Sequence, residues 1–258
     1  MAERGLFIVI EGCDKAGKTT QMEMLEDYVK SQGREFVRTR EPGGTEDGEK
    51  IRKFLLERDA ILNPLSPNEE ALGFYLSRGI HLRKKVGPAL EEGKDVGTDR
   101  LDASTFVYQG VVQKVDFNFL RSLRKYVVTD SGYKPDITIF LDITIEEYEK
   151  RLKLEKDPSK FLVYEQKGPD FMRKVLRGYR RYYCGLDEEH VSNENLMPLN
   201  GMRSKELIHE DIKLVVDETR KHGRVTRSTK LRLLEELRQE FDSLINDRYA
   251  DDYEGLNT

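Results

Sequence analysis

The sequence predicts an α/β fold: a five-stranded parallel sheet with helices on both faces and a helical extension at the C-terminus. Short apolar runs rich in β-branched residues alternate with longer segments of helical periodicity, which is typical of a parallel sheet covered on both faces. The first apolar run, Leu6–Glu11, leads directly into a glycine-containing loop and then into an amphipathic helix. The 258 residues suffice for one such domain with an appendage.

The composition describes a chain with a highly charged surface. Charged residues make up 36% of the chain and hydrophobic residues 37%, and the formal net charge is −4. This balance gives no general basic field for nucleic acid, and no apolar run approaches the roughly 18 residues of a membrane-spanning helix. The start, Met1–Gly5, lacks a signal-peptide pattern, and Cys13 and Cys184 lie far apart, as reduced thiols commonly do. We expect a cytoplasmic protein that binds neither nucleic acid nor membranes.

The loop after the first strand carries the pattern Gly-x-x-x-x-Gly-Lys-Thr. Its glycines allow the backbone to turn with N–H groups pointing inward, and the following helix adds the positive end of its dipole. Lys18 can reach the outer phosphates of a nucleotide, and the Thr19 hydroxyl can ligate Mg²⁺. The strand–loop–helix context therefore predicts a P-loop NTPase-like site. Its candidate ATP-binding residues are Gly12, Cys13, Asp14, Lys15, Ala16, Gly17, Lys18, Thr19 and Thr20.

Strands and helices are expected to alternate along the first half of the chain. The expected strands are Leu6–Glu11, Glu35–Thr39 and, more weakly on composition, Asp95–Asp99. The expected helices are Lys18–Ser31, Asp47–Glu57 and Asn68–Glu92. Gly33 and Gly93 follow the first and third helices, where a left-handed residue commonly ends a helix.

The second half continues the alternation and then changes character. The expected strands are Ile137–Asp142 and Asn195–Asn200, and the expected helices are Asp102–Val128, Ile145–Glu155, Asp170–Tyr183 and Ser204–Lys221. We therefore assign a main domain to residues 1–221 and an extension to residues 222–258. The extension contains an amphipathic helix, Lys230–Asn246, and a frayed acidic tail from Tyr249. A single such stripe must pack on the main body, which we favour, or on a partner.

A phosphate-binding loop alone does not distinguish a GTPase, a motor ATPase and a kinase. No Asn-Lys-x-Asp for reading guanine occurs in the chain. Arg40, Arg78 and Arg100 fall at expected strand ends or on a helix near the same edge of the sheet, and a guanidinium grips phosphate oxygens bidentately. One such arginine is more often a solvated surface residue, but three together predict a second phosphate site.

Several further motifs, taken in order, resemble the thymidylate kinase family, whose members phosphorylate dTMP to dTDP with ATP. The motifs are Phe7–Gly12, Thr39–Thr45, Phe74–Arg78, Asp99-Arg100, Ser104–Gly110, and Pro135-Asp136 before Leu141-Asp142. The resemblance covers about residues 6–221. It implies Mg²⁺ as cofactor, ATP and dTMP as the small-molecule partners, and a homodimer built through helix packing.

The resemblance also implies roles for the residues of the acceptor site. Phe74 would stack on the thymine ring, and Arg78 would donate to a base oxygen. Arg40 and Arg100 would hold the 5′-phosphate. The remaining predicted substrate-binding residues are Asp14 for the sugar 3′-hydroxyl, Tyr108 against the 2′ position, and Ser104, Thr105 and Gln109 around the base.

The predicted catalysis is electrostatic. A nucleoside monophosphate is already mostly a dianion near neutral pH, since its second pKa is about 6, so it needs no general base. Lys18, Arg100 and Mg²⁺ would neutralise the charge of the transferred phosphoryl group. Asp99 is the preferred acidic contact to the metal, beside Thr19, and Asp142 is the competing candidate. His81 and Cys13 are interpreted as packing residues near the pocket and not as catalysts, and the alternative for Cys13 is a thiol pKa lowered by the helix N-terminus.

The chain departs from the family pattern at two places that bear on catalysis and specificity. The family usually has a transition-state arginine in the phosphate loop or in the mobile lid. Here the phosphate loop has Lys15 instead, and the only cationic residues of the lid, about residues 152–165, are lysines. We predict that Lys15 is the catalytic cation. The alternative candidate is a lid lysine, Lys153, Lys156 or Lys160. The glycine-rich continuation after Gly110 is replaced by Val111–Gln113.

Three functional hypotheses follow. We favour a thymidylate kinase. A broader deoxynucleoside monophosphate kinase is the second, because Val111–Gln113 leaves the base preference open. The third is a weakly active nucleotide-binding protein that recruits a partner through the tail helix.

Overall fold

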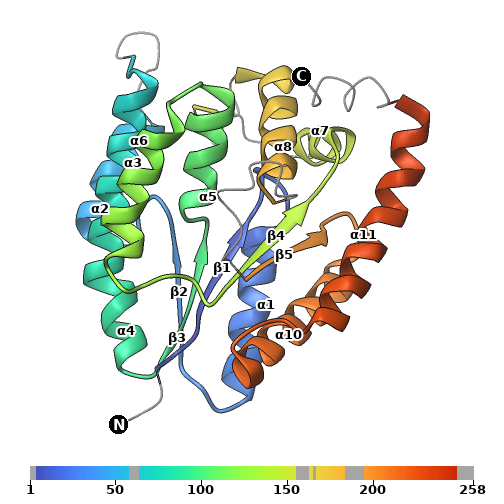
Figure 1. Ribbon diagram of the computed structural model, residues 1–258, viewed down its shortest axis with the longest axis horizontal. Coiled ribbons are helices and arrows are strands. Elements are labelled where there is room, and N and C mark those ends of the chain that lie inside the picture. The colour runs from blue at the N-terminus through green and yellow to red at the C-terminus, as the bar shows by residue number, and fades with distance from the viewer. Residues whose placement is uncertain (1–3, 58–63, 155–162, 165–166, 184–194, 249–258) are drawn as a thin grey trace.

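The computed structural model describes residues 4–57, 64–154, 163–164, 167–183 and 195–248, with side chains as far as Leu237. Its centre is a parallel sheet with the strand order β2-β3-β1-β4-β5 (Figure 1), which confirms the predicted fold class. The strands are β1 Phe7–Glu11, β2 Phe36–Arg40, β3 Asp95–Asp99, β4 Ile137–Asp142 and β5 Leu196–Asn200.

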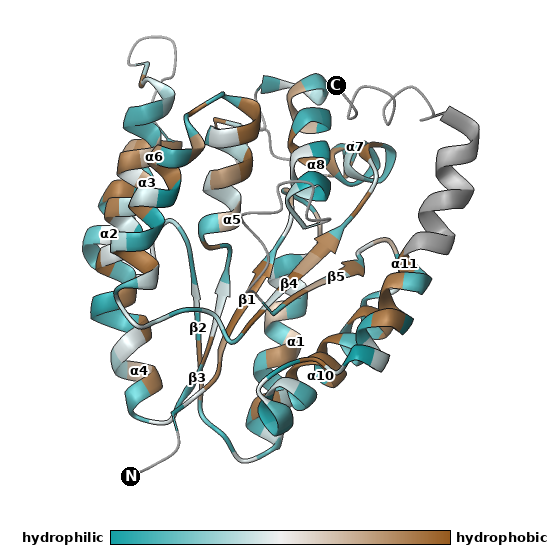
Figure 2. Ribbon diagram, viewed as in Figure 1, coloured by the Kyte–Doolittle hydropathy of each residue, from teal (hydrophilic) through white to brown (hydrophobic). Residues whose placement is uncertain are grey.

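The central strand β1 is buried along its whole length, and hydrophobic residues concentrate on β1 and β4 (Figure 2). Ile10 pairs with Asp99 on one side, and Glu11 pairs with Phe140 on the other. The chain leaves β1 toward β2 and crosses from β3 to β4. Such a reversal of strand order opens a crevice at the carboxyl edge of a parallel sheet, where ligands bind.

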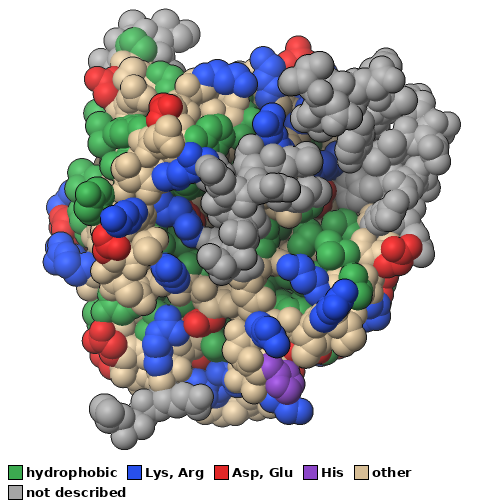
Figure 3. All heavy atoms as spheres, in the orientation of Figure 1, with side chains coloured by type: hydrophobic (Ala, Val, Ile, Leu, Met, Phe, Trp, Pro, Cys, Tyr) green, Lys and Arg blue, Asp and Glu red, His purple; other side chains and the backbone are tan. Residues whose placement is uncertain are grey.

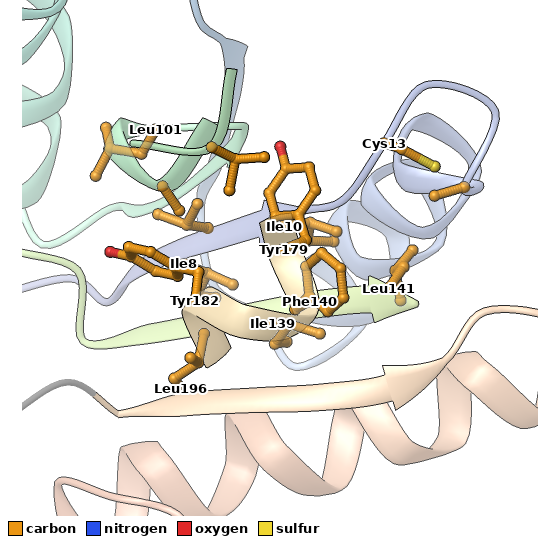
Figure 4. Close-up of a cluster of buried hydrophobic side chains, with 14 of the residues drawn as sticks. Ile8, Ile10, Cys13, Leu101, Ile139, Phe140, Leu141, Tyr179, Tyr182 and Leu196 are labelled. Atoms are coloured by element: carbon orange, nitrogen blue, oxygen red, sulfur yellow. The ribbon is translucent and has the colours of Figure 1, made fainter. Parts of the chain in front are cut away.

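Side chains alternate between the two faces along each strand, so the buried strands present apolar residues on both faces of the sheet. Helices therefore cover both faces. Gly97, which pairs with Ile8, lies against Met22 of α1 (Lys18–Ser31). Phe140 faces the other way, toward Tyr179 of α8 (Pro169–Tyr183), and the two ring centroids are 4.9 Å apart. Figure 4 shows this pair within the buried cluster. Helix α10 (Lys205–His222) packs beside α1.

Two predicted helices are interrupted. The segment expected at Asn68–Glu92 consists of α3 (Pro67–His81), a π-helical turn η1 (Leu82–Val86) and α4 (Gly87–Glu91). The expected helix Asp102–Val128 is wrong as one element. The structure has α5 (Asp102–Thr105), η2 (Phe106–Val112), α6 (Phe117–Arg124) and η3 (Lys125–Thr129). The break occurs because Lys114 has a φ of 65° and the Asp116 carboxylate caps a new helix by accepting from Phe119 N.

The other elements agree with the sequence to within a few residues. They are α2 (Glu46–Leu56), α7 (Ile145–Lys153) and the extension helix α11 (Arg227–Arg248). The extension helix packs on β5 and buries Leu233 and Leu237, which confirms packing on the main body, the arrangement favoured over packing on a partner. The tail from Tyr249 lies outside the described residues. Among the described helices, none is long and apolar enough to cross a membrane.

Candidate active site

A cavity of about 550 Å³ lies at the carboxyl edge of the sheet. Its lining comes from the loop after β1, the ends of β2 and β3, helices α1 to α3 and α5, the π-helical segments η1 and η2, and Tyr164. All of the predicted substrate-binding residues line it: Asp14, Arg40, Phe74, Arg78, Arg100, Ser104, Thr105, Tyr108 and Gln109. Sequence positions almost 100 residues apart are therefore brought together by the parallel strand ends.

Cationic side chains hold the carbonyl groups of the glycine loop. Lys18 is buried and donates from Nζ to the Cys13 carbonyl oxygen at 2.8 Å. Arg100 Nη1 donates to the Gly12 carbonyl at 2.7 Å, and Arg151 Nη1 donates to the Lys15 carbonyl at 3.0 Å. With its carbonyl groups engaged in this way, the loop can direct N–H groups toward an anion.

Arg100 is the hub between the glycine loop and the cavity. Its Nη2 lies 2.5 Å from Asp14 Oδ1, and its Nη1 donates to Tyr179 OH at 2.9 Å. Burial alone would lower the pKa of Arg100, but the Asp14 carboxylate together with Tyr179, Tyr108 and Asp99 outweighs burial and raises that pKa well above its usual value. Conversely, burial favours protonated Asp14, yet the charges of Arg100 and Lys18 hold the pKa of Asp14 below its usual value. Both groups are therefore charged at neutral pH.

Glu11, which belongs to the motif Phe7–Gly12 but was predicted to have no role in the site, organises the turn after β3. Its buried carboxylate accepts from Leu101 N at 2.8 Å and from Ser104 Oγ at 2.7 Å. Tyr179 OH donates to the same carboxylate at 3.1 Å. Burial raises the pKa of Glu11, although Arg100 and these hydrogen bonds oppose that shift. The Ser104 hydroxyl is thus occupied by Glu11 while it also accepts from Arg100.

One end of the cavity presents Phe74 and the Arg78 guanidinium. Arg78 is buried, and its Nε donates to Glu41 Oε2 at 2.7 Å. Its Nη2 donates to the Leu101 carbonyl at 2.8 Å and to Thr105 Oγ1 at 3.2 Å. Among the described residues, Arg78 Nη1 has no hydrogen-bond partner. A buried donor without a partner at the wall of a cavity suits an acceptor oxygen of a ligand.

A second buried carboxylate, that of Glu70, lies behind the lining residues Gln109 and Tyr164. Glu70 Oε2 accepts from Gln109 Nε2 at 3.1 Å, from Tyr164 OH at 2.8 Å and from Gln113 Nε2 at 2.8 Å. Gln113 belongs to the segment that replaces the family's glycine-rich continuation, so the altered segment is tied to the wall of the cavity. Tyr164 lies beyond the predicted glycine and arginine motifs, and its contribution was not evident from the sequence.

The opposite end is cationic and more open. Arg40 is 54% exposed, and its Nη2 pairs with Glu49 Oε2 at 3.0 Å. Arg52, from α2, also lines the cavity and was missed by the sequence analysis. Burial and the neighbouring Arg40 and Arg100 charges lower the pKa of Arg52, which shows that positive charge is concentrated here.

Thr19 and Asp99 are suitable ligands for a divalent cation. Both line the cavity, and Asp99 Oδ1 lies 3.8 Å from Lys18 Nζ. Among the described residues, this buried oxygen accepts no hydrogen bond. The competing candidate, Asp142, is taken up by structural contacts: Arg180 Nε donates to it at 3.0 Å, and Tyr183 OH donates to it as well.

The structure bears on two predicted residues of the glycine loop, Cys13 and Lys15. Cys13 is a buried packing residue, and the alternative of a lowered thiol pKa is wrong, because complete burial raises the pKa of this thiol to about 12. Lys15 is outside the lining of the cavity, and its backbone has a left-handed φ of 63°. The lid residues Lys156, Lys160 and Glu165, like Cys184, lie outside the described residues.

The chain resembles proteins of one kind in three comparisons. Residues 10–212 match the family model described as thymidylate kinase. A thymidylate kinase of Thermoanaerobacter sp. (strain X514) is 36% identical over 210 residues, covering 81% of this chain and 96% of the relative. The enzyme of Chlamydia trachomatis serovar D is 40% identical over 174 residues, covering 67% of this chain and 83% of the relative. The crystal structure of the Ehrlichia chaffeensis thymidylate kinase has a TM-score of 0.60 and 26% identity over 83% of this chain and 99% of that one.

Proposed function

The chain belongs to the thymidylate kinase family, and from this membership we propose how its cavity performs the family's reaction. The chain is an enzyme that transfers the γ-phosphoryl group of ATP to dTMP and gives dTDP, a step of dTTP synthesis. The comparisons do not favour the broader kinase or the weakly active binding protein. The residue assignments below are our proposal.

We assign the cavity to dTMP, with thymine at the Phe74 and Arg78 end. The observation that carries this assignment is that Nη1 of buried Arg78 has no hydrogen-bond partner among the described residues, while the Phe74 ring, which is 9% exposed, lines the same cavity. Arg78 Nη1 would donate to a base oxygen, and Phe74 would stack on the base. Thr105 and Gln109 would complete the base pocket, and Ser104 would act chiefly by holding Glu11 and Arg100.

The 5′-phosphate of dTMP is placed at the cationic end. Arg40 and Arg100 would grip its oxygens, and Arg52 would add charge. Asp14 would accept from the 3′-hydroxyl, with Tyr108 OH 3.5 Å from Asp14 Oδ2 and the Tyr108 ring in position to crowd a 2′-hydroxyl. The ion pair between Asp14 and Arg100 would thus couple sugar recognition to phosphate recognition.

The phosphates of ATP are placed in the loop Gly12–Thr20. The loop N–H groups and Lys18 would bind the β- and γ-phosphates, and the in-line arrangement of donor and acceptor would supply much of the rate enhancement. Lys15 is proposed as the cation that takes the place of the usual arginine. Thr19 and Asp99 would hold Mg²⁺, which supplies charge neutralisation for the phosphates when bound. Since Mg²⁺ typically uses only one or two protein ligands plus phosphate oxygens, these two residues fit it.

The test is ADP formation from ATP and Mg²⁺ with dTMP, dUMP, dCMP, dGMP and dAMP offered separately. Turnover dominated by dTMP is expected from the family, and dAMP should be the poorest acceptor, because adenine has no carbonyl oxygen for Arg78. Equal turnover with several acceptors would show that the segment Val111–Gln113 has relaxed base selection. Absence of turnover with every acceptor, despite ATP binding, would overturn the assignment.

We also propose that the enzyme is a homodimer. Large apolar side chains are exposed on α2, α3 and η3, and Figure 3 shows hydrophobic side chains along this edge of the molecule. They are Phe54, Leu72, Leu76 and Tyr126, which are 49–72% exposed. Such a cluster on a protein surface commonly marks an interface. Sedimentation should give a dimer for the native chain and a monomer for Leu76→Glu.

Two further assignments stay predictions. The chain is divided into a main domain of residues 1–221 and an extension of residues 222–258, which limited proteolysis can test. A cytoplasmic location can be tested by cell fractionation.

A further inference from the structure

The extension helix α11 lies outside the stretch that matches the family, yet it is firmly attached to the main body. Gly223, with a φ of 70°, ends α10, and the chain turns back along β5 (Figure 1). At this corner Glu218 of α10 accepts from Thr226 N at 2.7 Å and from Thr229 Oγ1 at 2.7 Å. Val225 and Leu233 join the core cluster. The helix therefore has a defined position relative to the sheet.

At the carboxyl end of β5, α11 forms an ionic network with the loop that precedes α10. Arg203 of this loop places Nη1 2.6 Å from Asp211 Oδ2 and 3.2 Å from Glu236 Oε2. Arg232 donates to the other oxygen of Glu236 at 2.7 Å. Asp211 is 8% exposed and Arg203 is 22% exposed, so this network is partly shielded from water.

The loop held by Arg203 also holds the glycine loop. Two residues before Arg203, the Gly201 carbonyl accepts from Arg151 Nη2 at 2.8 Å. Arg151 Nη1 donates to the Lys15 carbonyl at 3.0 Å. Gly201 N donates to the Asp142 carbonyl at 2.7 Å, and a Cβ at Gly201 would lie 2.9 Å from Ile143. Gly201 is therefore held between Arg151 on one side and the end of β4 on the other, in direct continuity with the Arg203 loop.

We infer that α11 is a positioning element for the ATP side of the active site, acting through Glu236, Arg203, Gly201 and Arg151 on the loop that contains Lys15. This inference rests on the proposed placement of ATP in residues 12–20. It predicts that a change in α11 weakens the binding of ATP more than the binding of dTMP. The acceptor residues Phe74, Arg78 and Arg40 come from α3 and β2, on the opposite side of β1 from α11.

The test compares Glu236→Lys with Glu235→Lys in the full chain. Both variants change the charge of the same turn equally, so Glu235→Lys controls for the charge change, whereas Glu236→Lys also removes the carboxylate that lies 3.2 Å from Arg203 Nη1. We expect Glu236→Lys to raise the dissociation constant of a fluorescent ATP analogue and the KM for ATP by about two- to fivefold, the change that corresponds to about 0.4–1 kcal/mol for a partly exposed ion pair. The KM for dTMP should stay within about twofold of the native value, and Glu235→Lys should resemble the native enzyme.

Equal effects of the two variants would overturn the inference, because charge alone would then explain them. Equal increases in both KM values would do the same, because they would indicate general destabilisation. Arg203→Met is the second variant, for the case that Glu236→Lys does not fold. It should weaken binding of the ATP analogue at least as much as Glu236→Lys does. The binding titration needs no turnover. A native chain that binds the analogue without phosphorylating dTMP would therefore refute the proposed function and still allow this comparison.

Discussion

The ion pair between Glu41 and Arg78 offers a sharp test of how the base end of the cavity is held. Glu41 Oε2 accepts from Arg78 Nε at 2.7 Å, and Glu41 Oε1 lies 2.9 Å from His81 Nδ1. Both partners of the ion pair are 2% exposed. Glu41→Gln keeps the shape of the side chain but leaves the Arg78 charge without its nearest counter-ion. Breaking a buried pair in this way costs about 3–5 kcal/mol of stability.

That cost should be visible in two measurements. For a chain of this size, about 2–4 °C of Tm is lost per kcal/mol, so thermal unfolding should occur about 10 °C lower. Arg78 would also lose its fixed orientation toward the cavity. The loss of one charge-assisted hydrogen bond to the base, about 1.5 kcal/mol, should raise the KM for dTMP about tenfold and leave the KM for ATP nearly unchanged.

Thr39→Val is the matched control. The Thr39 hydroxyl lies 2.8 Å from His81 Nε2, at the far end of the same chain of contacts. This variant should lower Tm by less than Glu41→Gln does and should leave the KM for dTMP within about twofold of the native value, since the ion pair remains. The reasoning fails if Glu41→Gln melts like the native enzyme, or if its KM for ATP rises as much as its KM for dTMP.

The remaining predictions concern the phosphate sites and the stability of the fold. Arg100→Lys should lower kcat/KM for dTMP at least tenfold, about 1.4 kcal/mol, because lysine cannot bridge Asp14, Gly12 and the phosphate together; steady-state kinetics that show a native value would contradict this role. Gly12→Ala should abolish binding of an ATP analogue, since a Cβ there would lie 2.7 Å from the Leu141 carbonyl and φ is 142°; titration checks it. Burial raises the pKa of Asp95, but the hydrogen bonds and charges of Arg220 and Arg34 outweigh burial and hold this pKa below its ordinary 3.8. The ionised Asp95 carboxylate therefore stabilises the fold fully above pH 3.8, and this contribution is lost as the pH falls through the lower pKa of the folded state. Urea unfolding of Asp95→Asn should therefore show a deficit at pH 7 that shrinks below pH 3.8. A deficit that is independent of pH would exclude this linkage.

The local sequence was sufficient for most elements. Strand and helix periodicity located all five strands within one or two residues, and the pattern Gly-x-x-x-x-Gly-Lys-Thr located the loop before α1. The expected helix Asp102–Val128 failed because its apolar pattern continues through the break. The break depends on the left-handed Lys114 and on the Asp116 cap, and neither signal is strong in a segment that otherwise suits a helix.

The acceptor residues were named from motifs that lie in order along the chain, and the structure gathers them around one cavity. The supporting residues had no comparable signal. Glu11, Tyr179 and Arg151 act through contacts between residues 90 to 170 positions apart, so no local pattern indicates what they touch. A carboxylate at the end of a buried strand is ambiguous for the same reason. Asp99 keeps an oxygen without a hydrogen-bond partner among the described residues, whereas Asp142 is occupied by Arg180 and Tyr183.

The sequence by itself therefore determined the fold class, the phosphate loop and the family, because each depends on short-range spacing: apolar periodicity, glycines at a turn and ordered motifs. The tertiary structure decided which charges meet. It placed Arg100 between Asp14 and the Gly12 carbonyl, buried Glu41 against Arg78, and connected α11 to the glycine loop through Arg203 and Arg151. Charge pairing depends on distance and on exclusion of water, and both are set only when the strand ends converge.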